Sequence, residues 1–405
     1  MDSSTIIVLN YTKMLTLVLL ILFQPGEGGT SPISCYNDQG EAADWFYLYK
    51  LPHIEENNDG QRYLLMDKGR AGWMDGQGSV NDSVGALGRT VGQLYDQGKN
   101  GDIAYILYND QRPHTEEKRQ LDDLGHECGH TKGVVLLDKT QGYWLVHSTP
   151  HFPPVKDVGQ YSYPESGVPN GQNFICVTYP LEFFQTIGEQ LQINQPSVYD
   201  CDVPDSLASL LPALNAVCKK SREQLVNGSF LHSKPASNRS IALTSLGGTE
   251  FISFAKGRSF KNDLYHSWVA PSLQSNLLVQ FWIRSTGILP SNCTLGWKVL
   301  NIKVISLGDR VTFGVAKDHS KWAVSTTGGG LDGAAGWVCV GDINRDEAEE
   351  SRGGGTVCLQ DAAVWKAYRT AAVDCEMCDG ETSKCDVTAG GRMNGYASVA
   401  PRVAT

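Results

Sequence analysis

Short apolar runs recur along the chain at spacings that predict β-strands. These runs cover residues 103–108, 133–137, 143–147, 174–179, 251–255, 277–283, 299–305, 311–315, 321–325 and 337–340. Between them, stretches with one apolar face predict helices over 83–95, 181–191, 205–220 and 364–373. In the first of these helices, Val84, Leu87, Val91 and Leu94 share the apolar face. Strands that alternate with helices predict an α/β or α+β sandwich.

The chain contains two similar halves. The first includes GHTKGVVLLD followed by GYWLVHSTP, and the second includes DHSKWAVSTT followed by GWVCVGDIN. When Gly142 is aligned with Gly336, His147 falls over Gly341. Such a repeat predicts one site formed across a pseudo-twofold interface. We expect a first half at 32–226, an exposed connection at 227–240, a second half at 241–385 and a disordered tail at 386–405.

The first 31 residues have the layout of a secretory signal peptide. Lys13 precedes the apolar run 14–23, and small residues follow up to Ser31. The competing interpretation is a buried core helix. A membrane span is excluded, because about ten residues are too few to cross a bilayer. We expect residues 1–31 to be removed, with translation starting at Met1 or Met14. No later run reaches eighteen apolar residues, so we expect a soluble mature chain.

Two further features are typical of a secreted chain. N-glycosylation sequons occur at Asn81, Asn227, Asn238 and Asn292. The 11 cysteines predict disulfides with one thiol left over, which Cys128 could supply. The spacing of Cys339 and Cys358 predicts one of these disulfides. Cys375 and Cys378 form a C-x2-C pair, but no second pair or histidine lies near enough to complete a zinc site.

The net charge depends strongly on pH. At pH 7 the formal charge is −10, which argues against nucleic-acid binding because such proteins usually carry a basic surface. At about pH 4.5, roughly thirty of the 44 carboxylates remain ionised and all nine histidines are protonated, so the net charge becomes roughly +13. The acidic composition therefore excludes a nucleic-acid partner only at neutral pH.

The motifs His130-x-Lys132 and His319-x-Lys321 carry the candidate chemistry. Residues i and i+2 of a strand point to the same face, so each motif places an imidazole beside an ammonium group. The two lysines could neutralise a phosphodiester while one histidine attacks phosphorus and the other protonates the leaving oxygen. This chemistry requires no metal or other cofactor, because the lysines supply the positive charge. A third match, His232-x-Lys234, precedes a proline and enters no predicted strand, so we interpret it as a chance occurrence.

Longer segments are more specific than these short motifs. They are ISCYNDQGEAADWFYLYKLP, GHTKGVVLLD, YWLVHSTPHFPP, SFAKGRSFKNDLYHSWVAP, LLVQFWIRSTGILPSNC, DHSKWAVS and CVGDINRDEAEESRGGGTVC. In these segments, from about Cys35 to Cys378, the chain resembles the deoxyribonuclease II family, a branch of the phospholipase D superfamily. The resemblance implies an α/β, phospholipase D-like pseudo-dimer of two mixed-sheet α-β-α halves that share one active site at their interface.

The resemblance also implies an activity and a set of residues. The activity is hydrolysis of double-stranded DNA at acid pH without divalent metal, through a phosphohistidine, leaving 3′-phosphate and 5′-hydroxyl ends. By matching positions, the catalytic residues are His130, Lys132, His319 and Lys321, with His147 as a further active-site histidine. The implied disulfides join Cys35 to Cys176, and Cys293 to Cys378 or its neighbour Cys375.

The chain departs from the superfamily pattern at two places. The usual Asp five residues after the Lys is replaced by Leu137 and Thr326, and Asp138 is one place late, so we interpret Asp138 as a strand-end residue. The usual Gly-Ser-x-Asn is present only in the second half as GDIN, where Asp342 and Asn344 could support the site. The first-half counterpart, HSTP, lacks the Asn. We therefore expect the two catalytic histidines to have different roles, and the nucleophile stays unassigned.

Other conspicuous side chains have ordinary structural interpretations. We expect the three tryptophans in predicted strands, Trp282, Trp322 and Trp337, to be core residues rather than platforms for bases. We expect four further histidines to be surface or local hydrogen-bonding groups: His114, His126, His151 and His266. Arg345 and Arg352 could contact phosphate or pair with neighbouring acidic residues, and the sequence leaves both alternatives open.

The leading functional hypothesis is an acid endonuclease that degrades DNA of engulfed or apoptotic cells in the lysosome. One alternative is a secreted, toxin-like deoxyribonuclease of the same family, and another is a phosphodiesterase acting on phospholipid or another phosphate ester. A signal peptide and sequons fit both a lysosomal and an extracellular destination. The expected partner is double-stranded DNA rather than a membrane, and the chain is expected to be a monomer or a homodimer.

Overall fold

The computed structural model describes residues 31–70, 72–98, 101–113, 128–227, 236–328 and 335–385. The chain divides into a unit of Met1–Ser31 and a unit of Pro32–Thr405, and the described helices and strands all belong to the second unit. Several predictions fall outside the described residues: the signal peptide before Ser31, His114, His126, the third His-x-Lys motif and the disordered tail.

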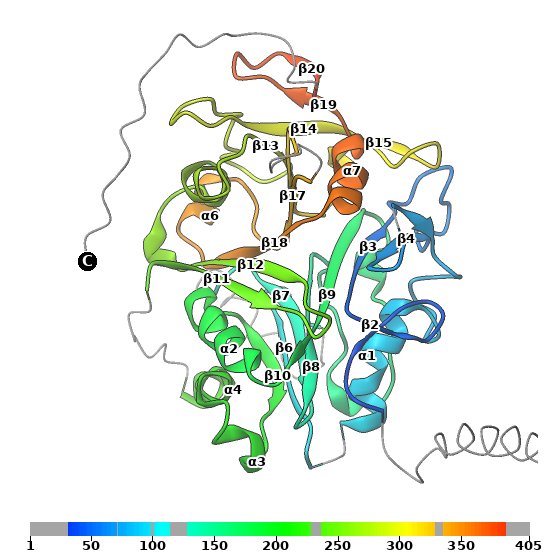
Figure 1. Ribbon diagram of the computed structural model, residues 1–405, viewed down its shortest axis with the longest axis vertical. Helices are drawn as coiled ribbons and strands as arrows, with labels where there is room; N and C mark the ends of the chain where they lie inside the picture. Colours follow the sequence, from blue (N-terminus) through cyan, green and yellow to red (C-terminus); the bar gives the residue numbers. More distant parts are fainter. Residues whose placement is uncertain are drawn as a thin grey trace, which may run out of the picture. The chain divides into compact units, whose positions relative to one another are not determined.

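An eight-stranded antiparallel sheet forms most of the first half (Figure 1). In spatial order its strands are β10 (Val198–Asp202), β6 (Ala104–Asn109), β7 (Lys132–Leu137), β8 (Gln141–His147), β9 (Gln172–Pro180), β3 (Trp45–Lys50), β4 (Tyr63–Asp67) and β5 (Met74–Asp75). The central strands β3, β6 and β7 are buried at every position, so both faces of this sheet are covered.

A ten-stranded sheet forms most of the second half. Its strands are, in order, β11 (Asn238–Thr244), β12 (Glu250–Lys256), β18 (Gly354–Gln360), β17 (Trp337–Gly341), β16 (Trp322–Ser325), β13 (Leu277–Gln280), β14 (Val299–Ser306), β19 (Ala372–Glu376) and β20 (Thr382–Lys384), with β15 (Thr312–Gly314) paired to β14. Its strand pairs are antiparallel except for β13 and β14, which are parallel. Two short strands, β1 (Cys35–Tyr36) and β2 (Ala42–Ala43), pair separately.

Five strands of each sheet follow the same order. The first sheet contains β6, β7, β8, β9 and β3 side by side, and the second contains β13, β16, β17, β18 and β12. In both sets the last-named strand comes first along the chain, and the other four follow in sequence. By this correspondence β7 matches β16 and β8 matches β17. The shared order agrees with the two halves that the sequence repeat predicts, in a mixed α/β chain.

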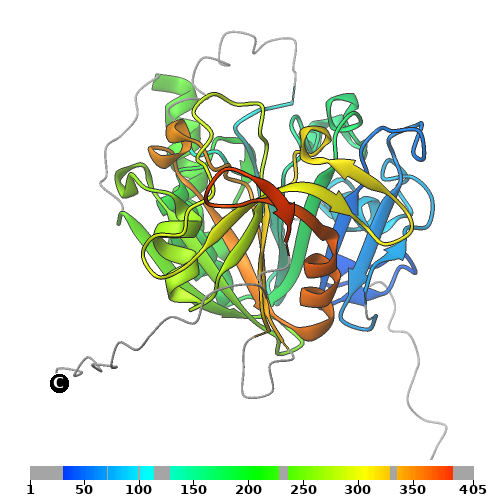
Figure 2. The same ribbon diagram turned by 90° about the horizontal axis from the view of Figure 1, so that it is seen from above.

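Helices cover both faces of the two sheets (Figures 1 and 2). The outer face of the first sheet packs against α1 (Ala86–Gln97), and the outer face of the second packs against the π-helical turn η5 (Tyr265–Val269) and α5 (Ala270–Ser272). The apolar cluster that joins the two sheets also includes α2 (Phe183–Asn194), α4 (Pro212–Asn227) and α7 (Ala362–Ala371). In the middle, β17 contacts β8 and β9 directly. Two single turns, α3 (Asp205–Ala208) and α6 (Glu347–Glu350), complete the helices.

Helix boundaries differ from the sequence prediction in all four predicted helices, and α2 (183–194) is shifted from the predicted 181–191. Helix α1 begins at Ala86 after an extended Gly85, so Val84 lies outside it and is 60% exposed. The helix predicted over 205–220 is split into α3 and α4 at Pro212, because proline lacks an amide hydrogen and favours the first position of a helix. The helix predicted over 364–373 ends at Ala371, and β19 follows directly.

Several strands also differ from the prediction. The strand predicted over 277–283 ends at Gln280, so Trp282 lies beyond it and is partly exposed. Strand β11 begins at Asn238, inside the predicted connection. Apolar periodicity did not predict β18, because this strand begins with two glycines. Strands β3, β4, β10, β19 and β20 were also absent from the prediction.

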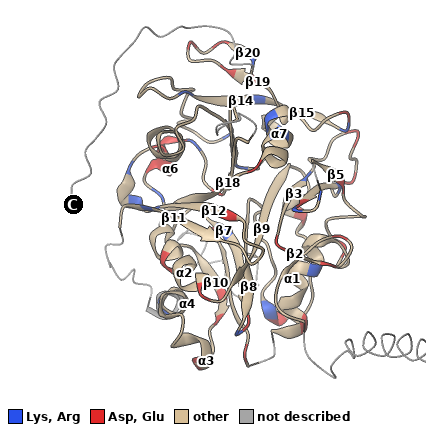
Figure 3. Ribbon diagram, viewed as in Figure 1, with Lys and Arg blue, Asp and Glu red and all other residues tan. Residues whose placement is uncertain are grey.

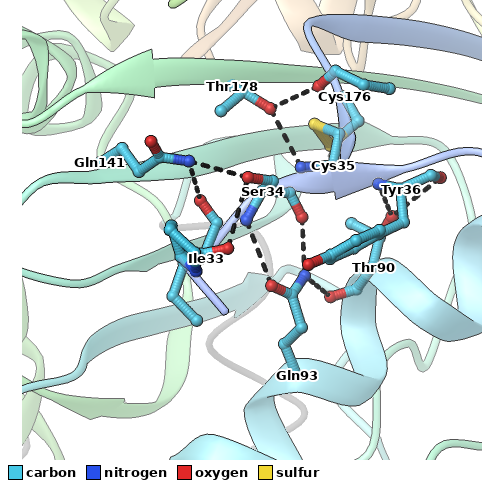
Figure 4. Close-up of a disulfide and its surroundings, with 11 residues drawn as sticks. Ile33, Ser34, Cys35, Tyr36, Thr90, Gln93, Gln141, Cys176 and Thr178 are labelled. Carbon is cyan, nitrogen blue, oxygen red and sulfur yellow. Dashed lines mark hydrogen bonds between the residues drawn. A yellow bond between two sulfur atoms is a disulfide. The ribbon is translucent and has the colours of Figure 1, made fainter. Parts of the chain in front are cut away.

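A disulfide fixes the beginning of the described chain to the first sheet (Figure 4). Cys35 bonds to Cys176 of β9, and the Cys35 amide donates to Thr178 Oγ1 at 3.0 Å. Beside the disulfide, the side chain of Gln93 accepts from the Ser34 amide at 3.1 Å and donates to the Ser34 carbonyl at 2.6 Å. These contacts hold the segment after the predicted cleavage zone against β9 and α1.

Ten of the 11 cysteines are paired. The disulfides are Cys35–Cys176, Cys201–Cys218, Cys293–Cys378, Cys339–Cys358 and Cys375–Cys385. The pair Cys339–Cys358 is the one that spacing predicts, and Cys35–Cys176 and Cys293–Cys378 are pairs that the resemblance implies. Cys128 is a free, buried thiol. Burial raises the pKa of the Cys128 thiol, which is the opposite of what an activated nucleophile requires.

Candidate active site

The two His-x-Lys motifs lie where the two sheets meet. His130 comes just before β7, and His319 comes just before the corresponding strand β16. The His130 amide donates to the Gly353 carbonyl at 2.9 Å, and the His319 amide donates to the Gly171 carbonyl at 2.8 Å. Because Gly353 precedes β18 and Gly171 precedes β9, each histidine is hydrogen-bonded to the opposite half.

Both of these contact points require glycine. A Cβ on Gly353 would lie 2.0 Å from the Asn194 carbonyl oxygen, and a Cβ on Gly171 would lie 2.3 Å from Asp318 Oδ1. These distances are far shorter than van der Waals contact, so a larger residue would push the two segments apart. Neither contact point therefore has room for a side chain between the two halves.

The backbone of each lysine is also held by the opposite half. Asn173 Oδ1 accepts from the Lys321 amide at 3.0 Å, and Asn173 Nδ2 donates to the Lys321 carbonyl at 3.1 Å. The Lys132 amide donates to the carboxyl group of Asp342. Asp342 Oδ1 also accepts from the Gly355 amide at 3.1 Å. Asp342, a predicted supporting residue, therefore supports the first-half motif rather than its own.

The four predicted catalytic side chains form one electrostatic group. Lys132 and Lys321 are buried, whereas His130 and His319 are partly exposed. Burial, followed by the charges of Lys321, Lys132 and His130, lowers the pKa of His319 to about 3. Burial and then Lys132 lower the pKa of Lys321 to about 8. Since charges of one half act on groups of the other, the structure brings the two motifs together.

His130 lies in a network of charged side chains. Its Nδ1 is 3.0 Å from Asp110 Oδ2, 3.2 Å from Glu349 Oε1 and 3.0 Å from Arg352 Nη1. Arg352 has carboxylate partners of its own, at 3.1 Å on Asp110 and 3.4 Å on Glu349. We therefore assign the proton to His130 Nδ1, which leaves a lone pair on Nε2. Among the described residues, His130 Nε2 has no hydrogen-bond partner.

Asp110 is the anionic centre of this network. Its Oδ1 bonds to Lys132 Nζ, and its Oδ2 bonds to Arg352 and His130. Burial alone would raise the pKa of Asp110, but these three groups hold it well below its usual range. Burial raises the pKa of Glu349 to about 7 and lowers the pKa of His130 to about 3. At acid pH, Asp110 therefore carries the negative charge and Glu349 is neutral.

His319 has a different neighbour. Its ring packs against Trp282 with 3.8 Å between the ring centroids and an interplanar angle of 60°. The prediction that Trp282 is a core residue is therefore wrong, because the strand ends before it and leaves it at the site. Across the described part of the chain, no carboxylate lies within ion-pair distance of Lys321. Among the described residues, Lys321 thus has no carboxylate in ion-pair contact, although the charge of Asp318 acts on it.

Asp318 ties the second motif to the first sheet. Tyr49 Oη donates to Asp318 Oδ2 at 2.5 Å, and Ser320 Oγ donates to the same oxygen at 2.6 Å. Burial raises the pKa of Asp318, while the hydrogen bonds from Ser320 and Tyr49 oppose that shift. Because Asp318 and Ser320 flank His319, these bonds fix the backbone that carries its ring.

In each half, a buried lysine at the end of one strand hydrogen-bonds to the segment that leads into the neighbouring strand. Lys50 ends β3, and its Nζ donates at 2.7 Å to the Val168 carbonyl, in the segment that leads into β9. Lys256 ends β12, and its Nζ donates to three carbonyls within residues 349–352, which lead into β18. Burial lowers the pKa of Lys50 to about 7 and that of Lys256 to about 8. Since β3 corresponds to β12, both halves use the same support.

Two predicted site residues remain, His147 and Asn344. His147 ends β8 and is fully buried, and its Nδ1 accepts from the Thr149 amide at 3.2 Å. Burial, with a contribution from Lys132, holds the pKa of His147 well below its usual range. The structure thus places a neutral His147 beside Lys132. Asn344 Oδ1 accepts from the Trp282 amide at 3.2 Å, so Asn344 positions Trp282.

The sequence left open whether Arg345 and Arg352 contact phosphate or pair with acidic residues, and in the structure both pair with acidic residues. Arg345 is buried and pairs with Asp263 at 2.7 Å. Arg352 belongs to the His130 network, as described above. Of the other two tryptophans, Trp322 is fully buried and Trp337 packs on the apolar cluster under η5, as expected of core residues.

The other predicted groups have local roles. His266 is buried and its Nε2 lies 3.1 Å from the Thr294 carbonyl oxygen, whereas His151 is partly exposed. Asp138 accepts from the Thr140 and Gln141 amides in the turn after β7, as expected of a strand-end residue. Of the sequon residues whose side chains are described, Asn81 is exposed, and Asn238 and Asn292 are partly exposed, so their glycosylation stays a prediction.

Sequence reasoning did not find three residues of the site, Asp110, Asn173 and Glu349, and it assigned a fourth, Trp282, to the core. Asp110 and Trp282 each follow a strand that pairs with the strand of a His-x-Lys motif. A search for residues opposite each motif would therefore have found this pair. Asn173 and Glu349 come from more distant segments, and no local pattern in the sequence marks them.

Acidic and basic residues are interspersed over elements of both sheets (Figure 3). Within the described residues, no group of three or more His, Cys, Asp or Glu side chains is arranged to hold a metal ion. None of the described helices is both long enough and apolar enough to cross a membrane.

Comparisons with known proteins identify the family. Residues 34–378 match the family model described as deoxyribonuclease II. The chain is 43% identical over 367 residues to deoxyribonuclease-2-alpha of Mus musculus, covering 89% of this chain and 97% of that protein. It is 42% identical to deoxyribonuclease-2-alpha of Sus scrofa (86% and 92% covered) and 35% identical to deoxyribonuclease-2-beta of Homo sapiens (89% and 96% covered). The chain therefore belongs to the deoxyribonuclease II family and is an acid deoxyribonuclease of that family.

Proposed function

We propose that the chain hydrolyses double-stranded DNA at acid pH without a divalent metal, through a phosphohistidine at His130. The observation that carries this proposal is the exchange of backbone hydrogen bonds between the halves, which sets His130 and His319 opposite one another. Two histidines and two lysines, contributed equally by the halves, match the requirements of phosphodiester cleavage through a covalent intermediate.

His130 is the better nucleophile of the two. Its Nδ1–H donates to the Asp110 carboxylate, with the neutral Glu349 carboxyl group also within 3.2 Å, so Asp110 fixes the tautomer and increases the electron density at Nε2. In the first step, His130 Nε2 forms a bond to phosphorus, the bond from phosphorus to the 5′-oxygen breaks, and protonated His319 gives its proton to that oxygen. In the second step, His319 takes a proton from water, the water oxygen attacks phosphorus, and the phosphorus–nitrogen bond breaks. The products are a 3′-phosphate and a 5′-hydroxyl end.

The two lysines have unequal roles in binding the phosphate. Lys132 is already paired with Asp110, whereas Lys321 has no carboxylate partner among the described residues. Lys321 is therefore the principal counter-charge for the non-bridging oxygens. The bound phosphodiester also places a negative charge beside His319 and raises its pKa, which favours the protonated form that the first step requires.

Activity at acid pH follows from two buried carboxyl groups. Burial raises the pKa of Glu349 and of Asp342 to about 7. At pH 5 both are neutral, so among Asp110, Asp342 and Glu349 only Asp110 opposes the positive charges of Lys132, Lys321 and Arg352. Near pH 8 both carboxyls are ionised and Lys321, whose pKa is about 8, is partly neutral, so the site loses its positive charge. A polyanionic substrate therefore binds more tightly as the pH falls.

Two further parts of the proposal concern the fold superfamily and the physiological setting. We propose a phospholipase D-like pseudo-dimer, because five strands in each sheet share one order and the site lies between them. The predicted signal peptide, the five disulfides and the acid-dependent site charge support a lysosomal nuclease that degrades DNA of engulfed or apoptotic cells.

Plasmid cleavage tests this function. Supercoiled plasmid is incubated with the purified chain from pH 3.5 to pH 8, with and without EDTA, and the ends are labelled to identify the phosphate. We expect maximal nicking near pH 5, no effect of EDTA, and 5′-hydroxyl ends that a kinase labels without prior dephosphorylation. A neutral optimum that EDTA abolishes, or turnover of phospholipid vesicles in preference to plasmid at pH 5, would overturn the proposal.

A further inference from the structure

Trp282 occupies in the second half the position that Asp110 occupies in the first. In the first sheet Asn109 lies opposite Lys132, and Asp110 is the next residue along the chain. In the second sheet Gln280 lies opposite Trp322, so the register continues with residue 281 opposite Lys321 and with Trp282 next. At this position the first half has a carboxylate that neutralises its own lysine, and the second half has an indole ring beside an exposed arginine.

The Trp282 ring contacts both the His319 ring and the Arg284 guanidinium group. The Arg284 guanidinium carbon lies 5.5 Å from the Trp282 ring centroid, which is itself 3.8 Å from the His319 ring centroid. The guanidinium carbon is therefore at most 9.3 Å from the centre of the histidine ring. Arg284 is exposed, and no ion pair to it occurs among the described residues.

The segment that carries this stack is anchored at both ends. The Trp282 amide donates to Asn344 Oδ1 at 3.2 Å, and Ser285 Oγ donates to Asp346 Oδ2 at 2.8 Å. Farther along, the Leu289 amide donates to the Arg345 carbonyl at 3.1 Å. The loop is thus attached to the segment after β17, which fixes the backbone on both sides of Arg284 near the site.

We propose that Arg284 binds the DNA phosphate next to the scissile one, on the leaving-group side, and that Trp282 positions both His319 and Arg284. A DNA strand presents one phosphate for about every 3.4 Å of helix axis, so a neighbouring phosphate is within reach of the guanidinium. Arginine suits this role because its planar donors bind phosphate in a bidentate manner and stack on aromatic rings. The leaving-group side is chosen because Arg284 stacks on the same indole ring that packs against His319, the proposed general acid, so the inference rests on the proposed function.

Arg284→Ala tests the inference, with Lys298→Ala as the matched control. Lys298 is also exposed, but its carbonyl accepts from the Leu277 amide at the start of β13, whereas Arg284 follows the end of that strand. At pH 5 we expect Arg284→Ala to raise KM for duplex DNA about tenfold, to leave kcat within about twofold, and to lower the salt slope of binding by about one. We expect no such change in Lys298→Ala.

End-labelled duplexes with one uncharged methylphosphonate then identify the phosphate. A methylphosphonate one nucleotide to the 3′ side of the cleaved bond should slow the wild type about tenfold and leave the Arg284→Ala variant unaffected, whereas one on the 5′ side should slow both alike. Trp282→Ala should lower kcat, and Trp282→Phe should restore most of it. An unchanged KM and salt slope in Arg284→Ala, or a 3′-side methylphosphonate that slows Arg284→Ala as much as it slows the wild type, would overturn the inference. Cleavage by His130→Ala would instead overturn the proposed function.

Discussion

The two histidines of the site share a backbone frame but not a chemical environment. His130 contacts Asp110, Glu349 and Arg352, whereas His319 packs against an indole ring next to a lysine that has no carboxylate in ion-pair contact among the described residues. The difference arises at the position that follows the strand opposite each motif, where one half has Asp110 and the other has Trp282. In the proposed function, this difference contributes to separating the nucleophile, His130, from the general acid, His319.

The shared frame explains why the halves can differ so freely elsewhere. Each histidine amide donates to a glycine carbonyl of the opposite half, and each lysine amide donates to a side chain of the opposite half. Even the supports correspond, since Ser148 Oγ accepts from the Asn173 amide as Asp342 Oδ1 accepts from the Gly355 amide. Backbone bonds therefore place the groups, and the side chains around them determine their roles.

The largest effect is expected from removing either histidine. His130→Ala and His319→Ala should each lower plasmid cleavage at pH 5 by at least about 10³-fold, because each removes a group that forms a bond or transfers a proton. The melting temperature should stay within a few degrees, since both side chains are partly exposed. Substantial cleavage by either variant would contradict a site that needs both halves.

A smaller but selective loss is expected from Asp110→Asn. This change removes the anionic centre that orients His130 and pairs with Lys132. We expect a loss of about 10²-fold or more in kcat, since a carboxylate that orients a catalytic histidine is worth up to about 10⁴-fold elsewhere. Trp282→Phe, at the corresponding position of the second half, is the matched control and should lose less than about tenfold. Equal losses would mean that the two environments are equivalent.

A change in pH dependence is expected from Glu349→Gln. Glu349 has a pKa raised to about 7, so the glutamine resembles the neutral form that is present at pH 5. Activity at pH 5 should stay within about twofold, and activity at pH 7.5 should rise roughly threefold to tenfold relative to the wild type, because one negative charge is absent. Rate profiles from pH 4 to pH 8 provide the measurement. A variant that is inactive at every pH would show that Glu349 must be ionised.

The smallest effect is expected in the stability of Asp342→Asn. Burial raises the folded-state pKa of Asp342 to about 7, above its value of about 4 in the unfolded chain. The folded state therefore binds more protons, and its stability falls as the pH rises from about 4 through 7. The variant lacks this loss, so its melting temperature at pH 7.5 should exceed that of the wild type by about 2 °C or more. A smaller difference is expected at pH 4, and an identical difference at both pH values would contradict the shift.

The sequence predicted the repeat better than it predicted the site. Local periodicity was sufficient for β7, β8, β16 and β17, because these are short apolar strands with a shared motif. It did not predict β18, where Gly354 and Gly355 replace apolar residues, since a Cβ at these positions would lie too close to Ile343 and to the Phe254 carbonyl oxygen of neighbouring segments. Nor could it assign Glu349, which reaches His130 from a part of the chain far away in sequence. Such contacts depend on how the two sheets pack, and no periodicity within one strand records that packing.

The assignment of His130 as nucleophile and His319 as general acid is tested most directly by changing the leaving group. A duplex in which sulfur replaces one bridging 5′-oxygen has a leaving group that needs no protonation. We predict that His319→Ala cleaves this phosphorothiolate bond at a rate within about tenfold of the wild type, while His130→Ala stays inactive on it. Rescue of His130→Ala with no rescue of His319→Ala would reverse the two roles and contradict the account of how the halves differ.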